Sequence, residues 1–196
     1  MADGNGVTPI EVRVENISQL FDTLDPYPFP ERDLDKDAEE YIVGWARELP
    51  RDQLISIVIH LPAAEAAKQD ARALTTALDR YFTYRTGIVL RDLNELFRVG
   101  RISLLIGLVV LGLCVAGARF ASRFLDDTEL GRFMQESLII LGWVANWKPI
   151  EIFLYDWWPL VRRRNLYRRL SEANVEVTAY DRTAELGSPA ELGSPL

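Results

Sequence analysis

The chain is poor in the residues from which metal and nucleophilic sites are usually built. Its 196 residues include one cysteine, Cys114, and one histidine, His60. A zinc site of the Cys₂His₂ or Cys₄ type needs four such side chains, so this class of site is excluded. A Cys–His or Ser–His–Asp catalytic site would have to use His60. We therefore expect no enzyme activity, no metal and no cofactor.

An excess of positive charge is also lacking. The chain has 22 Lys and Arg residues against 29 Asp and Glu residues, a formal net charge of −7. Nucleic-acid-binding proteins usually carry a basic face, so nucleic acid is not an expected partner. Residues 1–100 hold 11 basic and 18 acidic side chains, whereas residues 101–196 hold 11 of each. The acidic excess therefore belongs to the first half of the chain.

Charge is absent altogether from Ile102–Ala118, ISLLIGLVVLGLCVAGA. As a helix this run would be roughly 26 Å long, and a few further residues extend it to the roughly 30 Å of a hydrocarbon core. Arg101 and Arg119 bracket it, as basic residues often bracket membrane spans. We expect a first span over about 102–124.

A second apolar stretch, over about 133–154, follows a short polar turn and is interrupted by Lys148. Indole rings prefer the headgroup level of a bilayer, and most tryptophans of the chain lie in or just after this stretch. The sequence thus predicts a transmembrane helical hairpin over residues 101–158. The tryptophans concerned are Trp143, Trp147, Trp157 and Trp158.

Basic residues flank the two expected spans unequally, and membrane proteins keep such residues on the cytoplasmic side. We therefore expect a multi-pass protein of the cell (inner) membrane with both termini in the cytoplasm. The first ten residues have no basic segment followed by an apolar core, so no cleaved secretory signal is expected. Arg85, Arg91, Arg98, Arg101, Arg162, Arg163, Arg164, Arg168 and Arg169 lie outside the hairpin, against Arg119, Arg123 and Arg132 in its loop.

Residues 1–100 have the patterns of a small cytoplasmic α/β domain with a long helix that leads to the membrane. Residues 10–14 alternate apolar and polar side chains, and residues 53–61 are rich in β-branched side chains, as strands are. A helix over 35–49 lies between them, so the two strands should be parallel. The apolar face of this helix is expected to contain Tyr41, Ile42 and Trp45. The helix-forming stretch after Pro62 is expected to be continuous or kinked at Gly87 or Gly100.

The C-terminal part offers a third strand, which the domain needs because two strands alone rarely form a stable sheet. Residues 174–180 alternate again, and we expect this strand to join the first two or to pair with a neighbouring protomer. Residues 159–181 are thus expected to form a basic interfacial helix and a strand that rejoins the cytoplasmic domain. Residues 182–196, which contain the tandem repeat AELGSP, are expected to form a disordered tail.

Polar side chains near the end of the second span are candidate functional residues. Ionisable groups at membrane depth are costly and often form ion or proton sites. Alternatively they lie at the cytoplasmic interface, with Lys148 snorkelling and Pro149 allowing a bend into a surface helix over 150–170. The flanking tryptophans favour this alternative. The candidates are Asn146, Lys148, Glu151 and Asp156, of which Lys148 and Glu151 are spaced to pair.

Two further sets of residues are expected at surfaces. The basic side chains of the expected interfacial helix suit anionic lipid headgroups, and small residues four apart let helices approach closely. A longer small stripe of Ser103, Gly107, Cys114 and Gly117 could contact another protomer or a partner subunit. The lipid-binding candidates are Arg162, Arg163, Arg164, Arg168 and Arg169, and the helix-packing candidates are Ser103, Gly107, Gly112, Ala116 and Gly142.

Two motifs in the first half are interpreted as structural. Asp33, Asp35 and Asp37 resemble the start of a calcium loop, but the glycine and the distal glutamate are missing, so a helix start is favoured. His60 lies at the carboxyl end of the second strand, where open α/β sheets often bind ligands. No glycine-rich phosphate loop follows it, so no small-molecule substrate is identified.

The block Gly142–Pro159 (GWVANWKPIEIFLYDWWP), followed by Arg162–Arg164 and preceded by Gly100–Leu108, resembles a block of uncharacterised bacterial two-span membrane proteins. The likeness covers roughly residues 80–175. It implies a two-span topology and implies no activity.

Two functions are consistent with these patterns. The first is a membrane-anchored, non-enzymatic module whose cytoplasmic domain self-associates or binds a partner, as a small subunit or scaffold of a membrane complex. The second is an oligomeric ion or proton transport or channel subunit that uses Lys148, Glu151 and Asp156. Two spans cannot enclose a pore, so the second function requires an oligomer.

Overall fold

The computed structural model describes residues 8–29, 31–50, 53–124 and 128–180. The chain divides into two compact units, of which unit 1 comprises residues 1–87 and 165–196 and unit 2 comprises residues 88–164. The expected tail over 182–196 lies outside the described residues.

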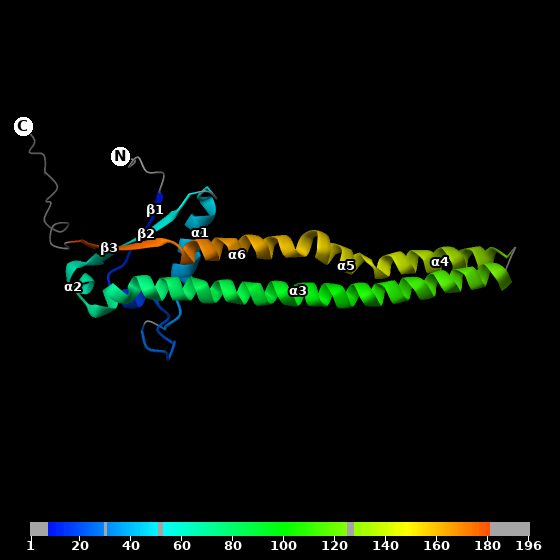
Figure 1. Ribbon diagram of the computed structural model, residues 1–196, viewed down its shortest axis with the longest axis horizontal. Coiled ribbons are helices and arrows are strands. Elements are labelled where there is room, and N and C mark those ends of the chain that lie inside the picture. Colours follow the sequence, from blue (N-terminus) through cyan, green and yellow to red (C-terminus); the bar gives the residue numbers. More distant parts are fainter. Residues whose placement is uncertain (1–7, 30, 51–52, 125–127, 181–196) are drawn as a thin grey trace, which may run out of the picture. The chain divides into compact units, whose positions relative to one another are not determined.

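Unit 1 contains a three-stranded parallel sheet (Figure 1). Strands β1 (Thr8–Arg13) and β3 (Asn174–Tyr180) both pair with the central strand β2 (Ile55–Pro62). The register aligns Ile10 with Ile57 and Ile57 with Val175. The predicted parallel β-α-β unit is confirmed, and the third strand joins it within the same chain.

Alternation along the strands gives the sheet one apolar and one polar face. The side chains of one face are buried and form the core, because successive strand residues point to opposite sides. The other face is mostly polar and is exposed on the outer strands, with Glu11 and Arg13 on β1 and Thr178 on β3, whereas Ser56 of the central strand is buried. The buried face consists of Ile10, Val12, Ile55, Ile57, Ile59, Leu61 and Val175.

Helix α1 (Lys36–Glu48) connects β1 to β2, after the short 3₁₀ turn η1 (Ile17–Leu20). Ile42, Val43 and Ala46 of α1 are buried, whereas Tyr41 and Trp45 are 47% and 49% exposed. The predicted apolar face was therefore wrong in part. The buried face of α1 is instead centred on Val43 and Ala46, because the side of α1 that faces the core also contains Glu39. The Glu39 carboxylate has hydrogen-bond partners on that side.

Helix α3 (Gln69–Phe124) follows the short helix α2 (Ala63–Ala66) and runs through both units without interruption at Gly87 or Gly100. The continuous form of the two predicted alternatives is thus observed. In unit 1 its residues Leu74, Leu78 and Phe82 are buried at helical spacing, as expected for the face that covers an apolar core.

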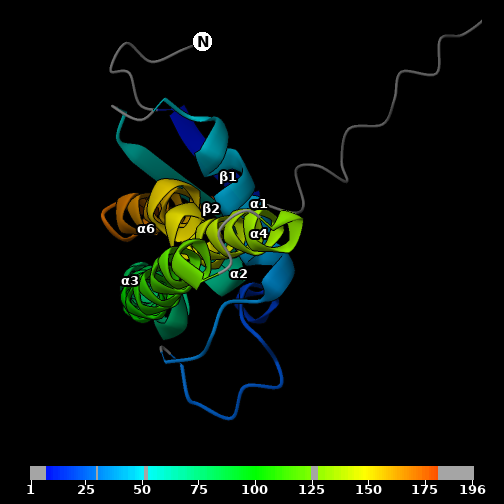
Figure 2. The same cartoon turned by 90° about the vertical axis from the view of Figure 1, so that its right-hand side faces the viewer.

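In unit 2 a second helical stretch runs back beside α3 (Figures 1 and 2). It consists of α4 (Glu129–Ala145), α5 (Trp147–Glu151), one π turn η2 (Ile152–Asp156) and the start of α6 (Trp157–Ser171). Thr128 caps α4 by accepting the Gly131 N–H at 3.2 Å. The predicted pair of long apolar helices is therefore present.

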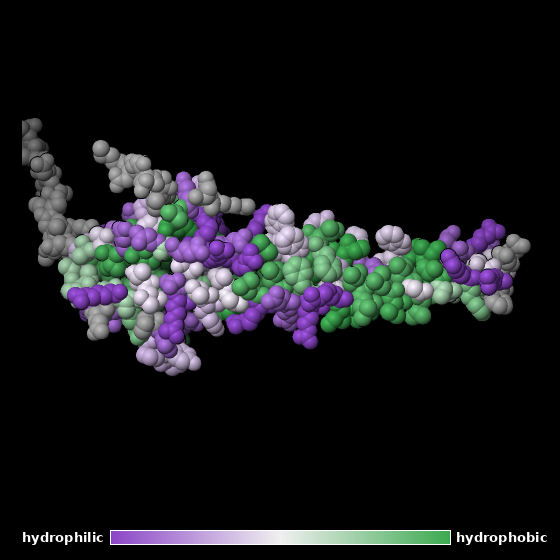
Figure 3. All heavy atoms as spheres, in the orientation of Figure 1, coloured by the Kyte–Doolittle hydropathy of each residue, from purple (hydrophilic) through white to green (hydrophobic). Residues whose placement is uncertain are grey.

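The apolar side chains of this pair are mostly exposed. The most hydrophobic windows of the two helices are only 17% and 22% buried, so most of their apolar surface has no protein cover. In Figure 3 these side chains form a green surface over α3 and α4. By length and composition both helices could cross a membrane.

Candidate functional site

Asn146 lies at an interruption of the second helix of unit 2. Pro149 has no N–H for the Ala145 carbonyl, and just before it the Asn146 N–H bonds the Trp143 carbonyl at 3.0 Å instead of the Gly142 carbonyl four residues back. Its side-chain Nδ2 then donates to the carbonyls of Gly142, at 2.9 Å, and Gly107, at 3.1 Å. Asn146 is 8% exposed. Its buried amide therefore satisfies the Gly142 carbonyl at the interruption and also binds α3 through the Gly107 carbonyl.

The chain stays beside α3 after the break. Ile152 is 2% exposed and approaches so closely that a methyl group added at Gly100 would lie 2.9 Å from it. Phe153 stacks on Phe97 with 6.2 Å between ring centroids. The expected bend away from the hairpin at Pro149 is not observed, because Gly100 makes room for the wide π turn.

Lys148, Glu151 and Asp156 form one ion cluster on the outer surface of unit 2. The Lys148 Nζ is 3.1 Å from the Glu151 Oε2 and 3.4 Å from the Asp156 Oδ2. The three side chains are 63%, 43% and 32% exposed, so they do not face α3. The cluster carries one negative charge more than its lysine neutralises.

Most of the expected small stripe is used within the hairpin. Methyl groups added at Gly107 and Gly142 would lie 2.6 Å from the Asn146 Oδ1 and 2.7 Å from Leu111. Gly117 faces Leu138, and Cys114 is 5% exposed, with its Cβ 3.4 Å from a methyl group added at Gly142. Gly107, Cys114 and Gly117 thus pack within the hairpin, as the spacing of small residues also allows, and contact with a second protein stays a prediction.

Gly112 and Ala116 differ from these residues because they point away from the second helix. Both are exposed, and a methyl group added at Gly112 would have no neighbour within 4 Å. Ser103 is half-buried on the side of α3 that carries Gly107.

The five arginines of α6 do not act as one uniform patch. Arg169 in unit 1 donates from Nη2 to the carbonyls of Pro50 and Gln53, both at 2.8 Å, so it supports the connection between α1 and β2. Arg168 pairs with Glu172 at 3.1 Å. In unit 2, Arg162 lies over the Trp158 ring at 5.4 Å. Arg162, Arg163 and Arg168 are exposed, and Arg164 is half-buried.

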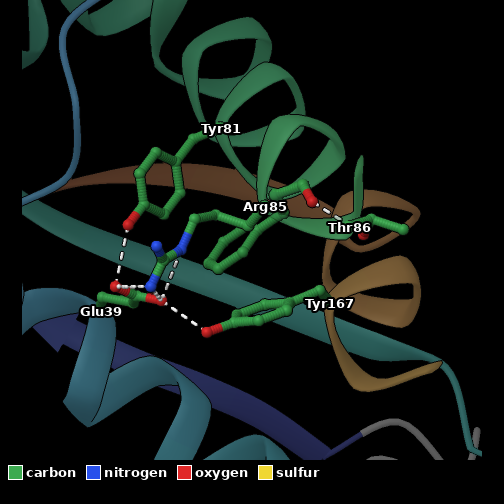
Figure 4. A network of polar contacts seen from close by, with 6 residues as sticks. Glu39, Tyr81, Arg85, Thr86 and Tyr167 are labelled. Carbon is green, nitrogen blue, oxygen red and sulfur yellow. Dashed lines mark hydrogen bonds and ion pairs between the residues drawn. The ribbon is translucent and has the colours of Figure 1, made fainter. Parts of the chain in front are cut away.

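A partly buried ion and hydroxyl network in unit 1 was missed by the sequence reasoning (Figure 4). The Glu39 carboxylate of α1 accepts hydrogen bonds from Tyr81 at 2.9 Å and Arg85 at 2.7 Å, both on α3, and from Tyr167 on α6 at 2.7 Å. Tyr167 also stacks on Phe82, with ring centroids 6.3 Å apart. The network thus ties three helices together. Its only sequence signal is that Glu39 precedes Ile42, Val43 and Ala46 by three, four and seven residues.

The network shifts the ionisation of its members. Burial alone would raise the pKa of Glu39, but hydrogen bonds from Tyr167, Arg85 and Tyr81 outweigh it and hold the pKa below its ordinary value. Burial and the bond to Glu39 raise the pKa of Tyr81. Glu39 is therefore ionised and Tyr81 neutral in the folded domain near pH 7.

His60 lies at the carboxyl end of β2, beside a shallow hollow of about 650 Å³. Its Nε2 is 3.7 Å from the Glu11 Oε2, and the Arg13 guanidinium lies 4.3 Å from the centroid of the Tyr180 ring in the same hollow. His60 and Glu11 lie on neighbouring strands, whereas Arg13 on β1 and Tyr180 on β3 meet over the central strand β2. The arrangement contains no nucleophile activated by His60 within the part of the chain that the structure describes.

The Asp33-Asp35-Asp37 motif begins a helix, as predicted. Asp35 is the N-cap of α1 and accepts the backbone N–H groups of Asp37, at 2.9 Å, and Ala38, at 3.4 Å. Burial raises the pKa of Asp33, and the nearby Asp25 adds to this shift. Among the described residues, no three His, Cys, Asp or Glu side chains are placed to hold a metal ion.

The comparisons with known proteins return no relative. No protein-family model, no curated protein and no solved structure matches the chain. The functional argument therefore depends on the geometry of the two units.

Proposed function

We propose that the protein is a membrane-anchored, non-enzymatic module. In this proposal the hairpin of unit 2 crosses the cell (inner) membrane, and unit 1 is a cytoplasmic domain that self-associates or binds a partner as a small subunit or scaffold. The observation that carries the proposal is the exposure of the apolar helices, whose windows are 17% and 22% buried. A core helix of a water-soluble protein would be mostly buried, so this exposed surface suits lipid.

The form of unit 1 supports a binding role. Its sheet is parallel, and parallel sheets are usually covered on both faces. Here one face of the sheet is mostly polar and, in the part of the chain that the structure describes, has no helix over it. Each edge strand, in contrast, has a carbonyl group that accepts a side-chain hydrogen bond: the Tyr41 hydroxyl donates to the Glu11 carbonyl on β1, and the Thr75 hydroxyl donates to the Val175 carbonyl on β3. The open face is thus a more suitable contact surface than the edges.

Single-cysteine labelling tests the topology, with Cys114 replaced by serine so that each introduced thiol is the only one. A membrane-impermeant thiol reagent added outside intact cells should label Asp127→Cys in the loop. It should label Asn174→Cys, at the start of β3, only after the cells are permeabilised. Equal labelling of both positions from outside would refute the arrangement with both termini in the cytoplasm. In a separate test, recovery of the protein in the aqueous phase after carbonate washing would refute the proposal that it is a membrane protein.

A transport or channel subunit is the second proposal, favoured by one observation. Three ionisable groups, Lys148, Glu151 and Asp156, lie within hydrogen-bond distance in an otherwise apolar surface. Because they face outward, a pathway would require a second copy to cover them. Proton or cation flux in vesicles with the reconstituted protein, lost in Glu151→Ala, is the result this proposal requires, and absence of flux in the unmodified protein would refute it.

A further inference from the structure

Two arginines on the outer surface of α3 lie near the expected membrane boundary without a carboxylate partner. Within the described residues, neither Arg98 nor Arg101 has an ion pair, and both are exposed. The exposed residues Leu105, Gly112 and Ala116 follow them at helical spacing, so all five lie on one face of α3. We call these five residues the α3 stripe.

The second helix of unit 2 has an outer stripe of its own. Four residues of this helix follow one another at spacings of four, three and four, and their side chains lie at the surface away from α3. They are Ile140, Val144, Trp147 and Glu151. Asp156 joins Glu151 through Lys148. This α4–α5 stripe therefore ends in a cluster with net negative charge, while the α3 stripe ends in two arginines.

The contacts within unit 2 place these charges at matching heights. Residues 100, 107, 111 and 117 of α3 meet residues 152, 146, 142 and 138 of the second helix, so the two run antiparallel in a register that shifts by no more than three residues. In that register Arg101 is level with residue 152, one position from Glu151. Arg98 is next to Phe97, which stacks on Phe153, so Arg98 lies about one helical turn from Asp156, a distance that an arginine side chain can span. One position corresponds to about 1.5 Å along a helix.

We propose that the α3 stripe of one copy packs against the α4–α5 stripe of a second copy. Arg101 of one copy then pairs with Glu151 of the next copy, and Arg98 pairs with Asp156. This inference rests on the proposed membrane function, because copies inserted in one bilayer with one orientation keep their residues at the same height. The contact is heterologous, and a rotation about the membrane normal closes it into a ring.

Charge and shape both favour this occupant. An exposed arginine at a membrane boundary gains from a carboxylate partner, because the surroundings are less polar than water. The cluster of Lys148, Glu151 and Asp156 has one carboxylate in excess of its lysine. Gly112 and Ala116, at the end of the α3 stripe away from the arginines, let a neighbouring helix approach closely, as small residues four apart do in membranes.

Cross-linking of introduced cysteines tests the contact in native membranes, in the full chain with Cys114→Ser. Gly112→Cys and Ile140→Cys lie at nearly the same height on the two stripes. When the two single variants are co-expressed, a short bifunctional maleimide should give a mixed dimer, and a chain with both cysteines should give a ladder of oligomers. Each variant alone should give no dimer. Dimers from Gly112→Cys alone would overturn the proposal, because they would indicate contact between two α3 stripes.

A matched control uses the residue next to Gly112. Leu113→Cys has the same height but is turned by about 100° around α3. Paired with Ile140→Cys, it should give at least fivefold less cross-linked product. Equal yields from Gly112→Cys and Leu113→Cys would overturn the proposal, since random collisions would explain both.

Charge reversal tests the ion pairs separately. Arg101→Glu and Glu151→Arg should each lower the cross-linking yield at least tenfold, and the two changes combined in one chain should restore it. Arg91→Glu, ten residues before Arg101 on α3, should leave the yield unchanged. Failure of the double variant to recover would overturn the pairing. Carbonate washing of the same membranes separates the two proposals: protein that stays in the bilayer without cross-links refutes only the contact, and protein that washes off refutes the membrane anchor.

Discussion

Replacing Glu39 by glutamine should destabilise unit 1 far more than the same change at its neighbour Glu40. Glu39 is 14% exposed and accepts hydrogen bonds from Arg85, Tyr81 and Tyr167, which come from two other helices. Glutamine keeps the size of the side chain but removes its charge and one acceptor. Arg85, itself only 28% exposed, then loses its counter-charge.

The expected loss is about 3 kcal/mol of unfolding free energy. Hydrogen bonds to a charged group contribute roughly 1.5–3 kcal/mol each but are not additive. Removing one partner of a fully buried ion pair costs about 3–5 kcal/mol, and the partial exposure of Arg85 places this site at the lower end. Glu40 is exposed, so Glu40→Gln should change stability by no more than about 0.5 kcal/mol.

Hydrogen exchange of the β2 amides in the detergent-solubilised full chain measures this difference. The amides of Ile55–Leu61 should exchange roughly 100-fold faster in Glu39→Gln than in the unmodified protein, since 1.4 kcal/mol corresponds to a factor of ten. They should be nearly unaffected in Glu40→Gln. Equal protection in the two variants would refute the structural role assigned to the network.

The same network predicts an acid-sensitive stability. Because the pKa of Glu39 is held below its ordinary value in the folded domain, the unfolded chain binds a proton at this group more readily. The contribution is complete above about pH 4.3, the ordinary value for glutamate, and is lost as the pH falls through the lowered folded pKa. The difference in stability between the unmodified protein and Glu39→Gln should therefore shrink over that range, and a difference independent of pH would contradict the assignment.

Three further predictions concern unit 2, and thermal unfolding in detergent measures each. Asn146→Leu should lower the stability of the hairpin by about 1–2 kcal/mol, because two carbonyls lose their donor, and an unchanged midpoint would contradict the bonds described. Gly107→Ala should also destabilise, since its methyl group would lie 2.6 Å from an amide oxygen, whereas Gly87→Ala has open space and should be neutral or stabilising by up to about 1 kcal/mol. Lys148→Ala and Glu151→Ala should each leave the unfolding midpoint nearly unchanged, because exposed ion pairs contribute little. A clear loss in either variant would show that the cluster supports the fold.

The elements of the fold were predictable because their patterns are local. Alternation in residues 10–14 and 174–180 and the β-branched run before His60 indicated the three strands. The charge-free run Ile102–Ala118 indicated the longest helix. Such patterns follow from which side chains are buried, which a single sequence records directly.

The interactions that fix the details were less accessible because they join distant residues. The bond between Asn146 and Gly107, and the network of Glu39 with Arg85 and Tyr167, each connect residues far apart in sequence. The π turn after Pro149 was missed because a proline predicts a break, but not how the chain recovers its packing. The burial of Glu39 depends on partners that the pattern of α1 alone does not contain.

The place of β3 in the sheet sets an order for biosynthesis. The whole of α3 to α6 lies between β2 and β3 in the chain, so the ribosome releases β3 only after the apolar hairpin has been made. Until then the domain has two strands, which is too few for a stable sheet. A hairpin that fails to return its second helix to the side of unit 1 would also leave Tyr167 and β3 beyond reach of Glu39 and β2. The completed domain thus requires the paired helices to form first, and a chain in which they fail to pair would present an unfinished domain to cellular proteases.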